Sequence, residues 1–429
     1  MATTAQSYGA HLLVFPFPSS GHIIPVLDLT RLLFARGLHI TVLVTPTYLP
    51  LLEPLLTSHP SSSIQSLVLS LPKPSISSQS NIFAKMSKLH ELRDPILQWF
   101  QSHPAPPVAI ISDFFLGWIH DLASQLKVPR VVFWPSGAFA SLVLNYLWRD
   151  LPRNDHPDDD NVLISLPKIP NSPKFPWWQL SRLYRACKEG DPDCEFFRNG
   201  MLANFASWAV VFNSFTNLEE IYIDHFKEKV MGHDRVCRCV LEDDQMEALA
   251  TALECSGVHF IWCVKTSDEE LVANESGGAI LDEFEDRVKD RGFVIRGWAP
   301  QLEILRHRAV GTFLTHCGWN SVLEGLNSGV MMLAWPMGAD QFCNAMLLVD
   351  QLGVAIRVCA GGEKVVPNST ELARLFIDSV SGARPERAIV MQLQEEASKA
   401  VLVKGGSSHR ELDELVKRLS ELHSGRHYD

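Results

Sequence analysis

Short apolar runs alternate with amphipathic stretches along the first half of the chain. This alternation is typical of a parallel sheet whose strands are joined by crossover helices, so it points to the α/β class. The expected strands are His11–Phe17, His39–Val44, Ile64–Leu69, Val108–Ser112, Arg130–Phe133 and Ala209–Asn213, and the expected helices are Ile23–Ala35, Asn81–Phe100, Leu116–Leu126 and Ala138–Trp148. We therefore expect a doubly wound, Rossmann-like domain that binds ligands beyond the carboxyl ends of its strands.

The same alternation returns from Val258 onward, and 429 residues are enough for two domains with separate cores. The strands expected here are Val258–Val264, Phe293–Ile295, Val310–Leu314, Val330–Ala334 and Ala355–Val358. The amphipathic helices expected at the end of the chain are Glu371–Ser379, Glu386–Val403 and Ser408–His423. The second half is thus predicted to be another Rossmann-like domain.

The run from Trp298 to Gln341 gathers polar residues around one expected helix start. The strand Val310–Leu314 leads through a tight loop into a helix over Trp319–Asn327, which Gly329 closes. The free N–H groups and partial positive charge at such a start favour a bound diphosphate. Three side chains add further donors at this place: His316, Asn320 and Ser321.

Other residues of this run suit the remaining parts of a nucleotide sugar. Glu324 lies one helical turn beyond Asn320, and its two carboxylate oxygens suit a ribose diol. Trp298 precedes the strand in a loop, where its indole face can stack on a flat base. Asp340 and Gln341 follow the next strand and offer a carboxylate and an amide to sugar hydroxyls. Each residue alone is better explained as core, cap or solvated side chain, and only the whole run predicts nucleotide-sugar binding.

Two polar residues stand at expected strand ends in the first half. His22 follows the first strand where a helix begins, and the helix dipole there favours a neutral ring that can accept a proton. Asp113 ends the fourth strand, and its carboxylate on the far ring nitrogen would stabilise the imidazolium formed by proton abstraction. Two simpler interpretations stay open: His22 as a surface turn residue, and Asp113 as the N-cap of the next helix.

The run from Trp298 to Gln341 resembles, from end to end, the signature box of the plant family 1 UDP-glycosyltransferases, which act on secondary metabolites. The segments GHIIP (21–25) and SDFF (112–115) resemble the GHxxP motif and the strand-end Asp of the same family. The resemblance implies the GT-B fold of two facing Rossmann-like domains. Residues 1–234 would bind the acceptor, residues 240–405 would bind the UDP-sugar, and a last helix in 406–429 would cross back to the first domain.

The resemblance also implies a role for each site residue. His22 would be the general base toward the acceptor hydroxyl, oriented by Asp113, in one in-line displacement with inversion and without metal or cofactor. A final Gln in the box, as at Gln341, usually accompanies glucose, so the implied donor is UDP-glucose. The residues implied to hold it are Trp298 and Ala299 at uracil, Gln301 and Glu324 at the ribose, His316, Asn320 and Ser321 at the phosphates, and Trp319, Asp340 and Gln341 at the sugar.

The acceptor is implied by a narrower resemblance. The segments HLLVFPFP, SDFFLGW and QMEALATALE resemble enzymes that act on flavonol 7-hydroxyls, which implies a small phenolic, flavonoid-like acceptor. Aromatic residues are dense beside Asp113, and while most are expected in the core, a minority could wall a flat apolar site.

One element that the resembled family carries is missing from the second half. The segment CRCV (237–240) passes directly into the expected helix LEDDQMEALATALE (241–254). Family members have, between those points, a domain linker and a strand that ends in a Ser-Phe-Gly-Ser type loop. Val236–Val240 is too short to replace that strand, and Arg238 interrupts it. We therefore expect a second sheet without its first strand, and we hypothesise a splice variant or mis-assembled gene product with weak or no activity.

Charge and cysteine usage exclude several kinds of partner. The net charge of −11 argues against nucleic acid or an anionic membrane as the main partner, and no apolar run is long enough to span a membrane. The nine cysteines have no zinc-type spacing and are expected to be reduced thiols, and the chain start lacks a signal-peptide pattern. These features predict a cytoplasmic protein whose partners are small molecules. They do not determine the oligomeric state, for which we expect a monomer.

Two other functions stay open. A nucleotide-sugar epimerase or hydrolase on the same fold would need its own acid–base pair near the sugar, and only His22 with Asp113 is evident. A pseudo-glycosyltransferase would bind UDP or a partner without turnover, which the missing strand would explain.

Overall fold

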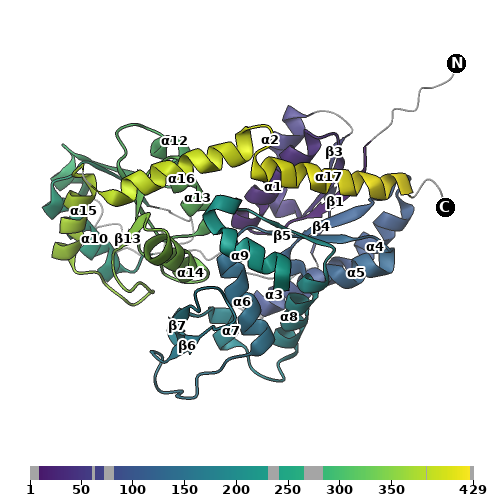
Figure 1. Ribbon diagram of the computed structural model, residues 1–429, viewed down its shortest axis with the longest axis horizontal. Helices are drawn as coiled ribbons and strands as arrows, with labels where there is room; N and C mark the ends of the chain where they lie inside the picture. Colours follow the sequence, from purple (N-terminus) through teal and green to yellow (C-terminus); the bar gives the residue numbers. More distant parts are fainter. Residues whose placement is uncertain are drawn as a thin grey trace. The chain divides into compact units, whose positions relative to one another are not determined.

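The computed structural model divides the chain into two compact units, which are described separately below (Figure 1). Unit 1 comprises Met1–Val236 with Lys399–Asp429, and unit 2 comprises Cys237–Ser398. The residues that the structure describes are 9–59, 63–71, 82–229, 241–264, 284–382 and 384–425.

Unit 1 is built on a six-stranded parallel sheet with the order β3-β2-β1-β4-β5-β8. Its strands are β1 (His11–Phe15), β2 (His39–Val44), β3 (Ile64–Val68), β4 (Ala109–Asp113), β5 (Arg130–Trp134) and β8 (Ala209–Phe212), so all six expected strands are confirmed within two residues. β1 pairs with both β2 and β4, and the strand order reverses between β1 and β4. Ligand sites of doubly wound sheets lie at such a switch point, beyond the carboxyl ends of the strands.

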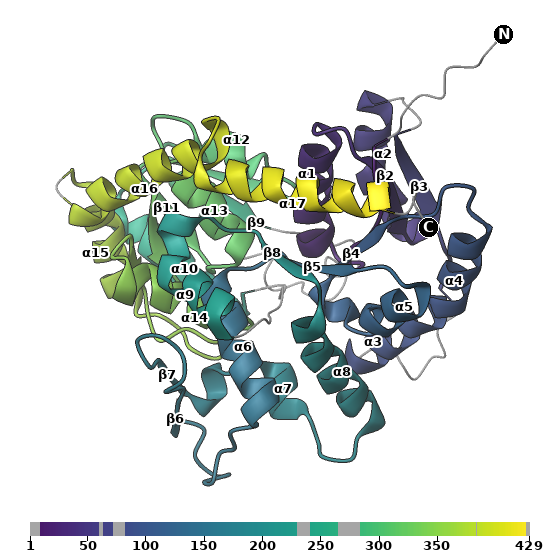
Figure 2. The ribbon, with the colours of Figure 1, turned by 45° about the vertical axis from the view of Figure 1, so that its right-hand side comes forward.

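Helices cover both faces of this sheet. They are α1 (Ser20–Phe34), α2 (Leu49–Ser58), α3 (Ile82–Leu89), α4 (Arg93–Ser102), α5 (Ile119–Leu126), α6 (Ala138–Asp150), α7 (Arg182–Ala186), α8 (Pro192–Ala203), α9 (Thr216–Lys229) and α17 (Ser407–Gly425). One core joins apolar residues of β1, α1 and α2 to Leu419 of α17. Figures 1 and 2 show α17 beside α1, and Arg36 after α1 donates to Asp413 of α17 at 2.7 Å. The end of the chain therefore belongs to the core of unit 1.

The single helix expected over Asn81–Phe100 is wrong, because the structure divides it. A 3-10 turn, His90–Leu92, separates α3 from α4. Pro95 lies in the first turn of α4 and has no backbone N–H to donate to the turn before it, so a continuous helix is disfavoured here.

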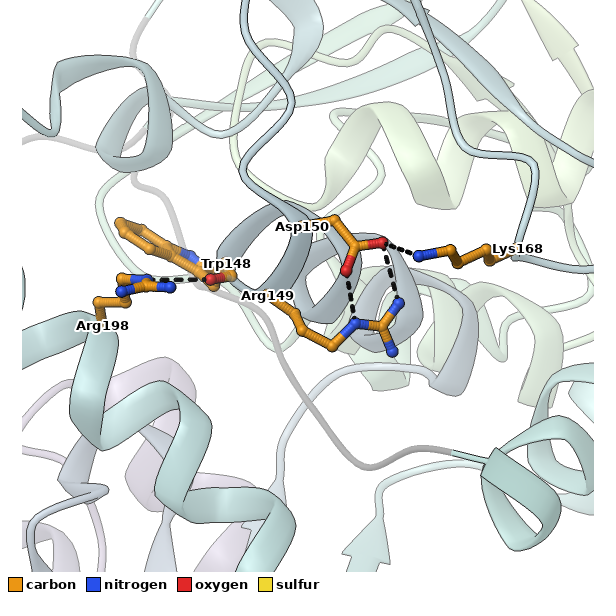
Figure 3. Close-up of polar contacts among 5 residues, drawn as sticks. All are labelled: Trp148, Arg149, Asp150, Lys168 and Arg198. Carbon is orange, nitrogen blue, oxygen red and sulfur yellow. Dashed lines mark hydrogen bonds and ion pairs between the residues drawn. The ribbon is translucent and has the colours of Figure 1, made fainter.

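The carboxyl end of α6 is held by hydrogen bonds and ion pairs (Figure 3). Asp150 accepts from Arg149 Nε at 2.7 Å and from Lys168 Nζ at 2.7 Å. Arg198 of α8 donates from Nε to the Trp148 carbonyl at 3.2 Å. The hydrogen bonds from Arg149 are the main reason that the pKa of Asp150 falls to about 2. α6 is thus anchored to its neighbours, including the segment between the short antiparallel strands β6 (Leu163–Ser165) and β7 (Lys174–Pro176).

Unit 2 contains two separate parallel sheets, ordered β10-β9 and β11-β12-β13. The strands are β9 (Phe260–Val264), β10 (Gly292–Arg296), β11 (Thr312–Thr315), β12 (Met331–Ala334) and β13 (Ala355–Arg357). In the doubly wound order 3-2-1-4-5-6, the first strand lies between the second and the fourth, which here are β9 and β11. Within the described ranges no strand fills that place, as the sequence predicts. The segment Val236–Val240, which the sequence analysis considered too short to replace the missing strand, lies outside those ranges.

The burial of the strands agrees with a missing centre. Every residue of β12 is buried, whereas β9 alternates between half-buried and exposed residues, and Phe293 of β10 is 64% exposed. A central parallel strand normally buries the strands on both of its sides. The two half-sheets still share one core, because Trp262 of β9 and Val294 of β10 pack against a buried cluster that includes Leu333 of β12.

The helices of unit 2 are α10 (Asp243–Ser256), α12 (Gln301–Leu305), α13 (Trp319–Asn327), α14 (Gln341–Ala345), the π-helix η7 (Met346–Gln351), α15 (Ser369–Val380) and α16 (Pro385–Leu402). Of these, α10 and α15 contribute buried residues to the shared core. α10 begins with a capping box between Glu242 and Gln245. Among the helices that the structure describes, none is both long and apolar enough to cross a membrane.

The expectation that all cysteines are reduced is wrong for one pair. Cys187 and Cys194 form a disulfide across the turn between α7 and α8. This turn brings their Cα atoms to 5.7 Å, within the usual range for a disulfide. Of the other cysteines, those that the structure describes form no disulfide: Cys255, Cys263, Cys317, Cys343 and Cys359.

Candidate active site

His22 and Asp113 meet at the switch point of the unit 1 sheet. His22 is the third residue of α1, which begins soon after β1, and Asp113 is the last residue of β4. The ring Nδ1 lies 2.6 Å from Asp113 Oδ2, and the two side chains are 1% and 0% exposed. Asp113 Oδ1 also accepts from Phe115 N at 2.9 Å. The carboxylate therefore caps the turn Phe114–Leu116 with one oxygen and holds the imidazole with the other, and a surface position for His22 is wrong.

Aromatic rings surround the imidazole. Phe115 and Phe114 stack on His22 with centroids at 5.0 and 5.7 Å, and Phe17 lies at 5.3 Å. Phe114 is itself stacked on Trp134 at 3.8 Å. Apolar surroundings exclude water and strengthen the hydrogen bond between the ring and the carboxylate. They also fix the ring in one orientation.

A buried guanidinium, which the sequence reasoning missed, lies beside this pair. Arg130, the first residue of β5, donates from Nε to Ser112 Oγ at 2.7 Å and from Nη2 to the Asp113 carbonyl at 3.3 Å. Burial lowers the pKa of Arg130 to about 9, while the charges of Asp113 and Asp121 act to raise it. Its cation thus compensates a buried carboxylate. The sequence held one signal for this buried cation, an arginine at the start of the otherwise apolar run RVVFW.

A second missed residue is the buried Glu219 of α9. Its carboxylate accepts from the backbone N–H groups of Ala138 at 2.9 Å and Phe139 at 2.8 Å, and from Ser214 Oγ at 2.5 Å. Burial raises the pKa of Glu219, and these three hydrogen bonds oppose the shift. Glu219 therefore caps the start of α6, near the carboxyl end of β5.

In unit 2, the predicted phosphate loop has the geometry of a helix start. Gly318 is the N-cap of α13, and Cys317 before it has a left-handed φ of 63°. A Cβ atom on Gly318 would lie only 2.5 Å from His316 Nε2, so the imidazole lies over the loop and would have to move if Gly318 were replaced. Burial raises the pKa of the Cys317 thiol to about 12, so this thiol stays protonated at neutral pH.

The residues predicted at the ribose lie together. Gln301, at the start of α12, donates from Nε2 to Glu324 Oε2 at 2.6 Å and to Ser321 Oγ at 3.3 Å. Trp298, in the loop after β10 and just before Ala299, is 85% exposed. An exposed indole is available for stacking on a base. These residues come from the loop after β10, from α12 and from α13.

The three residues predicted at the sugar, Trp319, Asp340 and Gln341, are all buried. Asn320, predicted at the phosphates, is half-buried. Gln341 Oε1 accepts from the N–H groups of Met337 at 2.8 Å and Gly338 at 3.0 Å, so this amide oxygen shapes the loop after β12. Burial raises the pKa of Asp340 to about 7, and a hydrogen bond from Asn344 opposes the shift.

Asn344 of α14 is the third residue that the sequence reasoning missed. Its Nδ2 donates to the Cys317 carbonyl and to Asp340 Oδ2, both at 2.9 Å. The only local signal is its position one helical turn after Asp340. Over the described part of the chain, no group of three or more His, Cys, Asp or Glu side chains is placed to hold a metal ion.

Comparison with known proteins relates both units to one family. Residues 236–361 match the family described as "UDP-glucoronosyl and UDP-glucosyl transferase". The chain is 46% identical over 467 residues to UDP-glycosyltransferase 89B2 of Stevia rebaudiana, covering 96% of this chain and 98% of that protein. It is 44% identical over 468 residues to flavonol 3-O-glucosyltransferase UGT89B1 of Arabidopsis thaliana, covering 96% of both.

Solved structures agree with these sequence relatives. UGT89C1 of Arabidopsis thaliana complexed with UDP-L-rhamnose has a TM-score of 0.76 and 32% identity, covering 97% of this chain and 100% of that one. The same protein complexed with quercetin has a TM-score of 0.74 at 32% identity, covering 96% and 100%. The two units therefore have the GT-B fold that the sequence predicts.

The sequence alignments are longer than the chain itself. The alignment with the Stevia protein spans 467 residues against the 429 of this chain, so at least 38 of its positions have no counterpart here. Since 96% of this chain is aligned, this difference in length agrees with an internal deletion.

Proposed function

The chain belongs to the plant family 1 UDP-glycosyltransferases, and from this membership we propose that it transfers glucose from UDP-glucose to a hydroxyl of a flavonoid-like acceptor with inversion. As a member of this family, the chain is a UDP-sugar-dependent glycosyltransferase, and its relatives indicate a flavonol-type acceptor. The sugar, the reacting hydroxyl and the residue roles are the proposal.

The bond between His22 and Asp113 is the observation that carries the proposal. A proton on Nδ1 donated to Asp113 Oδ2 leaves the lone pair of Nε2 to accept the proton of an acceptor hydroxyl. The acceptor oxygen then forms a bond to the anomeric carbon as the bond from that carbon to the diphosphate oxygen breaks, and UDP leaves. Asp113 stabilises the imidazolium that results. A phenolic hydroxyl suits this base because it is more acidic than an alcohol.

We assign the donor to the residues of unit 2. Trp298 with the Ala299 backbone would hold uracil, and Gln301 with Glu324 would hold the ribose. The start of α13 would take the diphosphate, because its N–H groups and dipole favour negative charge. The remaining polar contacts in this assignment are those of His316, Asn320 and Ser321 to the phosphates and of Trp319, Asp340 and Gln341 to the sugar.

UDP-glucose is favoured over UDP-L-rhamnose as the donor. The support is Gln341 at the end of the signature box and a relative described as a flavonol glucosyltransferase. The alternative donor has support of its own, since the UGT89C1 structure holds UDP-L-rhamnose. Transfer assays with both donors, at equal concentration and with one flavonol, separate the two.

The second candidate function is a UDP-binding pseudo-glycosyltransferase, and the split sheet of unit 2 favours it. The deciding measurement is UDP release from UDP-glucose by the purified chain, with and without a panel of flavonols and other phenols. Release that depends on the acceptor, and that His22→Ala and Asp113→Asn abolish, supports the transferase. UDP binding without release supports the pseudoenzyme, and release without an acceptor points to a hydrolase.

The monomeric state and the cytoplasmic location stay proposals. Light scattering on the purified chain measures the first, and a fluorescent fusion in plant cells measures the second. A dimer, or a signal outside the cytoplasm, would contradict them.

A further inference from the structure

One buried amide connects two parts of the proposed donor site. Asn344 is 1% exposed, and its Nδ2 lies 2.9 Å from both the Cys317 carbonyl oxygen and Asp340 Oδ2. A side-chain amide nitrogen has two hydrogens, so each acceptor can receive one of them. Cys317 belongs to the loop before α13, and Asp340 is the N-cap of α14.

The loop at Cys317 needs support from outside itself. A left-handed φ of 63° is uncommon for a residue with a side chain. Thr315 Oγ1 accepts from Cys317 N at 3.1 Å, and Asn344 donates to Cys317 O, so both backbone polar groups of this residue are held. The orientation of Cys317 sets where the first N–H groups of α13 point.

The carboxylate of Asp340 depends on the same amide. It is buried, and the hydrogen bond from Asn344 fixes the position of Oδ2. A displacement of either partner therefore changes the geometry that Asn344 offers to the other. Asn344 itself need not touch the donor to have this effect.

We propose that Asn344 is a positioning residue that couples the diphosphate end of the donor site to its sugar end. The inference rests on the proposed function, because the diphosphate is assigned to the start of α13 and the glucose to Asp340. Binding of UDP alone should already tighten the loop, and the amide then holds Asp340 for the sugar hydroxyls.

The test compares UDP and UDP-glucose binding by calorimetry, which needs no turnover. Leu is similar in size to Asn, so Asn344→Leu removes both N–H donors of Nδ2 with little change in side-chain volume. The Kd of UDP is expected to rise about tenfold, as for the loss of one hydrogen bond at a buried site. The Kd of UDP-glucose is expected to rise further, because Asp340 loses its position as well. Asp340→Ala should weaken UDP-glucose more than UDP, because Asn344 keeps its hydrogen bond to the Cys317 carbonyl and loses only its bond to Asp340.

The double variant distinguishes coupling from two separate effects. Once Asp340→Ala is present, Asn344→Leu should weaken UDP and UDP-glucose by the same factor, because the sugar contact is already lost. If Asn344→Leu raises the Kd of UDP-glucose by the same factor with and without Asp340→Ala, the two residues act independently, and the coupling is overturned. The same holds if Asn344→Leu leaves the Kd of UDP within twofold of the wild type.

Asn204 provides a matched control in unit 1. It is another fully buried asparagine, and its Nδ2 donates to the Phe114 carbonyl at 2.9 Å. Asn204→Leu should lower the melting temperature and leave the Kd of UDP unchanged, and an equal loss of UDP affinity would overturn a specific role for Asn344. If Asn344→Leu does not fold, Asn344→Ser, which keeps one donor, is expected to give an intermediate loss of UDP affinity, and a wild-type Kd would overturn the inference.

Failure of the proposed function gives a different result. A wild-type chain that binds neither UDP nor UDP-glucose contradicts the function, and the inference falls with it. A wild-type chain that binds and transfers, while Asn344→Leu behaves like it, contradicts the inference alone.

Discussion

The substitution Asp340→Asn is expected to stabilise the protein at neutral pH and to have little effect in acid. Asp340 is buried beside the strand β12, where burial raises the pKa of its carboxyl from 3.8 to about 7. Asn has the same shape, does not titrate, and can still accept from Asn344 through its amide oxygen.

The size and sign of the effect come from the difference between the pKa of Asp340 in the folded protein and its pKa in the unfolded chain. A raised pKa means that the folded state binds a proton that the unfolded state has already released, so stability is lost as the pH rises from 3.8 to about 7. At about 1.4 kcal/mol for each pKa unit, the wild type loses roughly 4 kcal/mol over that interval. Above pH 7 the loss is complete, and no further change is expected from this group.

Urea unfolding of the wild type and Asp340→Asn at pH 5, 6, 7 and 8 measures this difference. The free energy of unfolding of the variant, less that of the wild type, should rise by roughly 1.4 kcal/mol for each unit from pH 5 to 7 and then become constant. Asp290→Asn, at an exposed aspartate of the same unit, serves as the control and should give no such slope. A difference that is independent of pH, or that falls toward pH 7, would refute the assigned burial of Asp340.

Three further results are expected from single substitutions. Arg130→Met should lower the free energy of unfolding by about 1–3 kcal/mol, because Ser112 Oγ and the Asp113 carbonyl lose a buried donor; Arg130→Lys, which keeps a cationic donor, should lower it less, and an unchanged unfolding midpoint in Arg130→Met contradicts the importance of these contacts. Trp298→Ala should raise the KM for the UDP-sugar about tenfold at constant kcat, since stacking contributes about 1–3 kcal/mol for a base; an unchanged KM argues against stacking. Burial lowers the pKa of His11 from 6.5 to about 4, so the stability that the neutral ring contributes is complete above pH 6.5 and is lost as the pH falls toward 4. Acid titration followed by circular dichroism should therefore show a smaller loss of stability for His11→Asn than for the wild type. Equal losses in the two proteins contradict the lowered pKa of His11.

Strand and helix positions could be predicted from the sequence because the signal for them is local. Four strands of the first sheet, β1, β2, β4 and β5, are almost fully buried, and their sequences are the mostly apolar runs that burial on both faces requires. The missing centre of the second sheet was predictable for the same reason: the helix α10 has no strand pattern before it. Where a local signal was overlooked, as at Pro95 in the expected helix before residue 100, the prediction failed.

The contacts around the candidate site were harder to predict, because their partners are backbone groups from distant segments. Nothing near Arg130 in the sequence indicates the Asp113 carbonyl, and nothing near Asn344 indicates the Cys317 carbonyl. Glu219 reaches the start of α6 from 80 residues away. The disulfide between Cys187 and Cys194 was missed because spacing alone does not reveal how a turn brings two Cα atoms together.

The sequence by itself therefore determined the α/β class, the two Rossmann-like halves, the family and the absent strand, since each is written in residue patterns over short stretches. The tertiary structure decided which groups meet and in what environment. His22 and Asp113 lie 91 residues apart and pair because β1 and β4 are neighbours in the sheet. The raised pKa of Asp340 follows from burial. Burial and pairing are properties of packed neighbours, and packing joins segments whose order in space a local pattern does not specify.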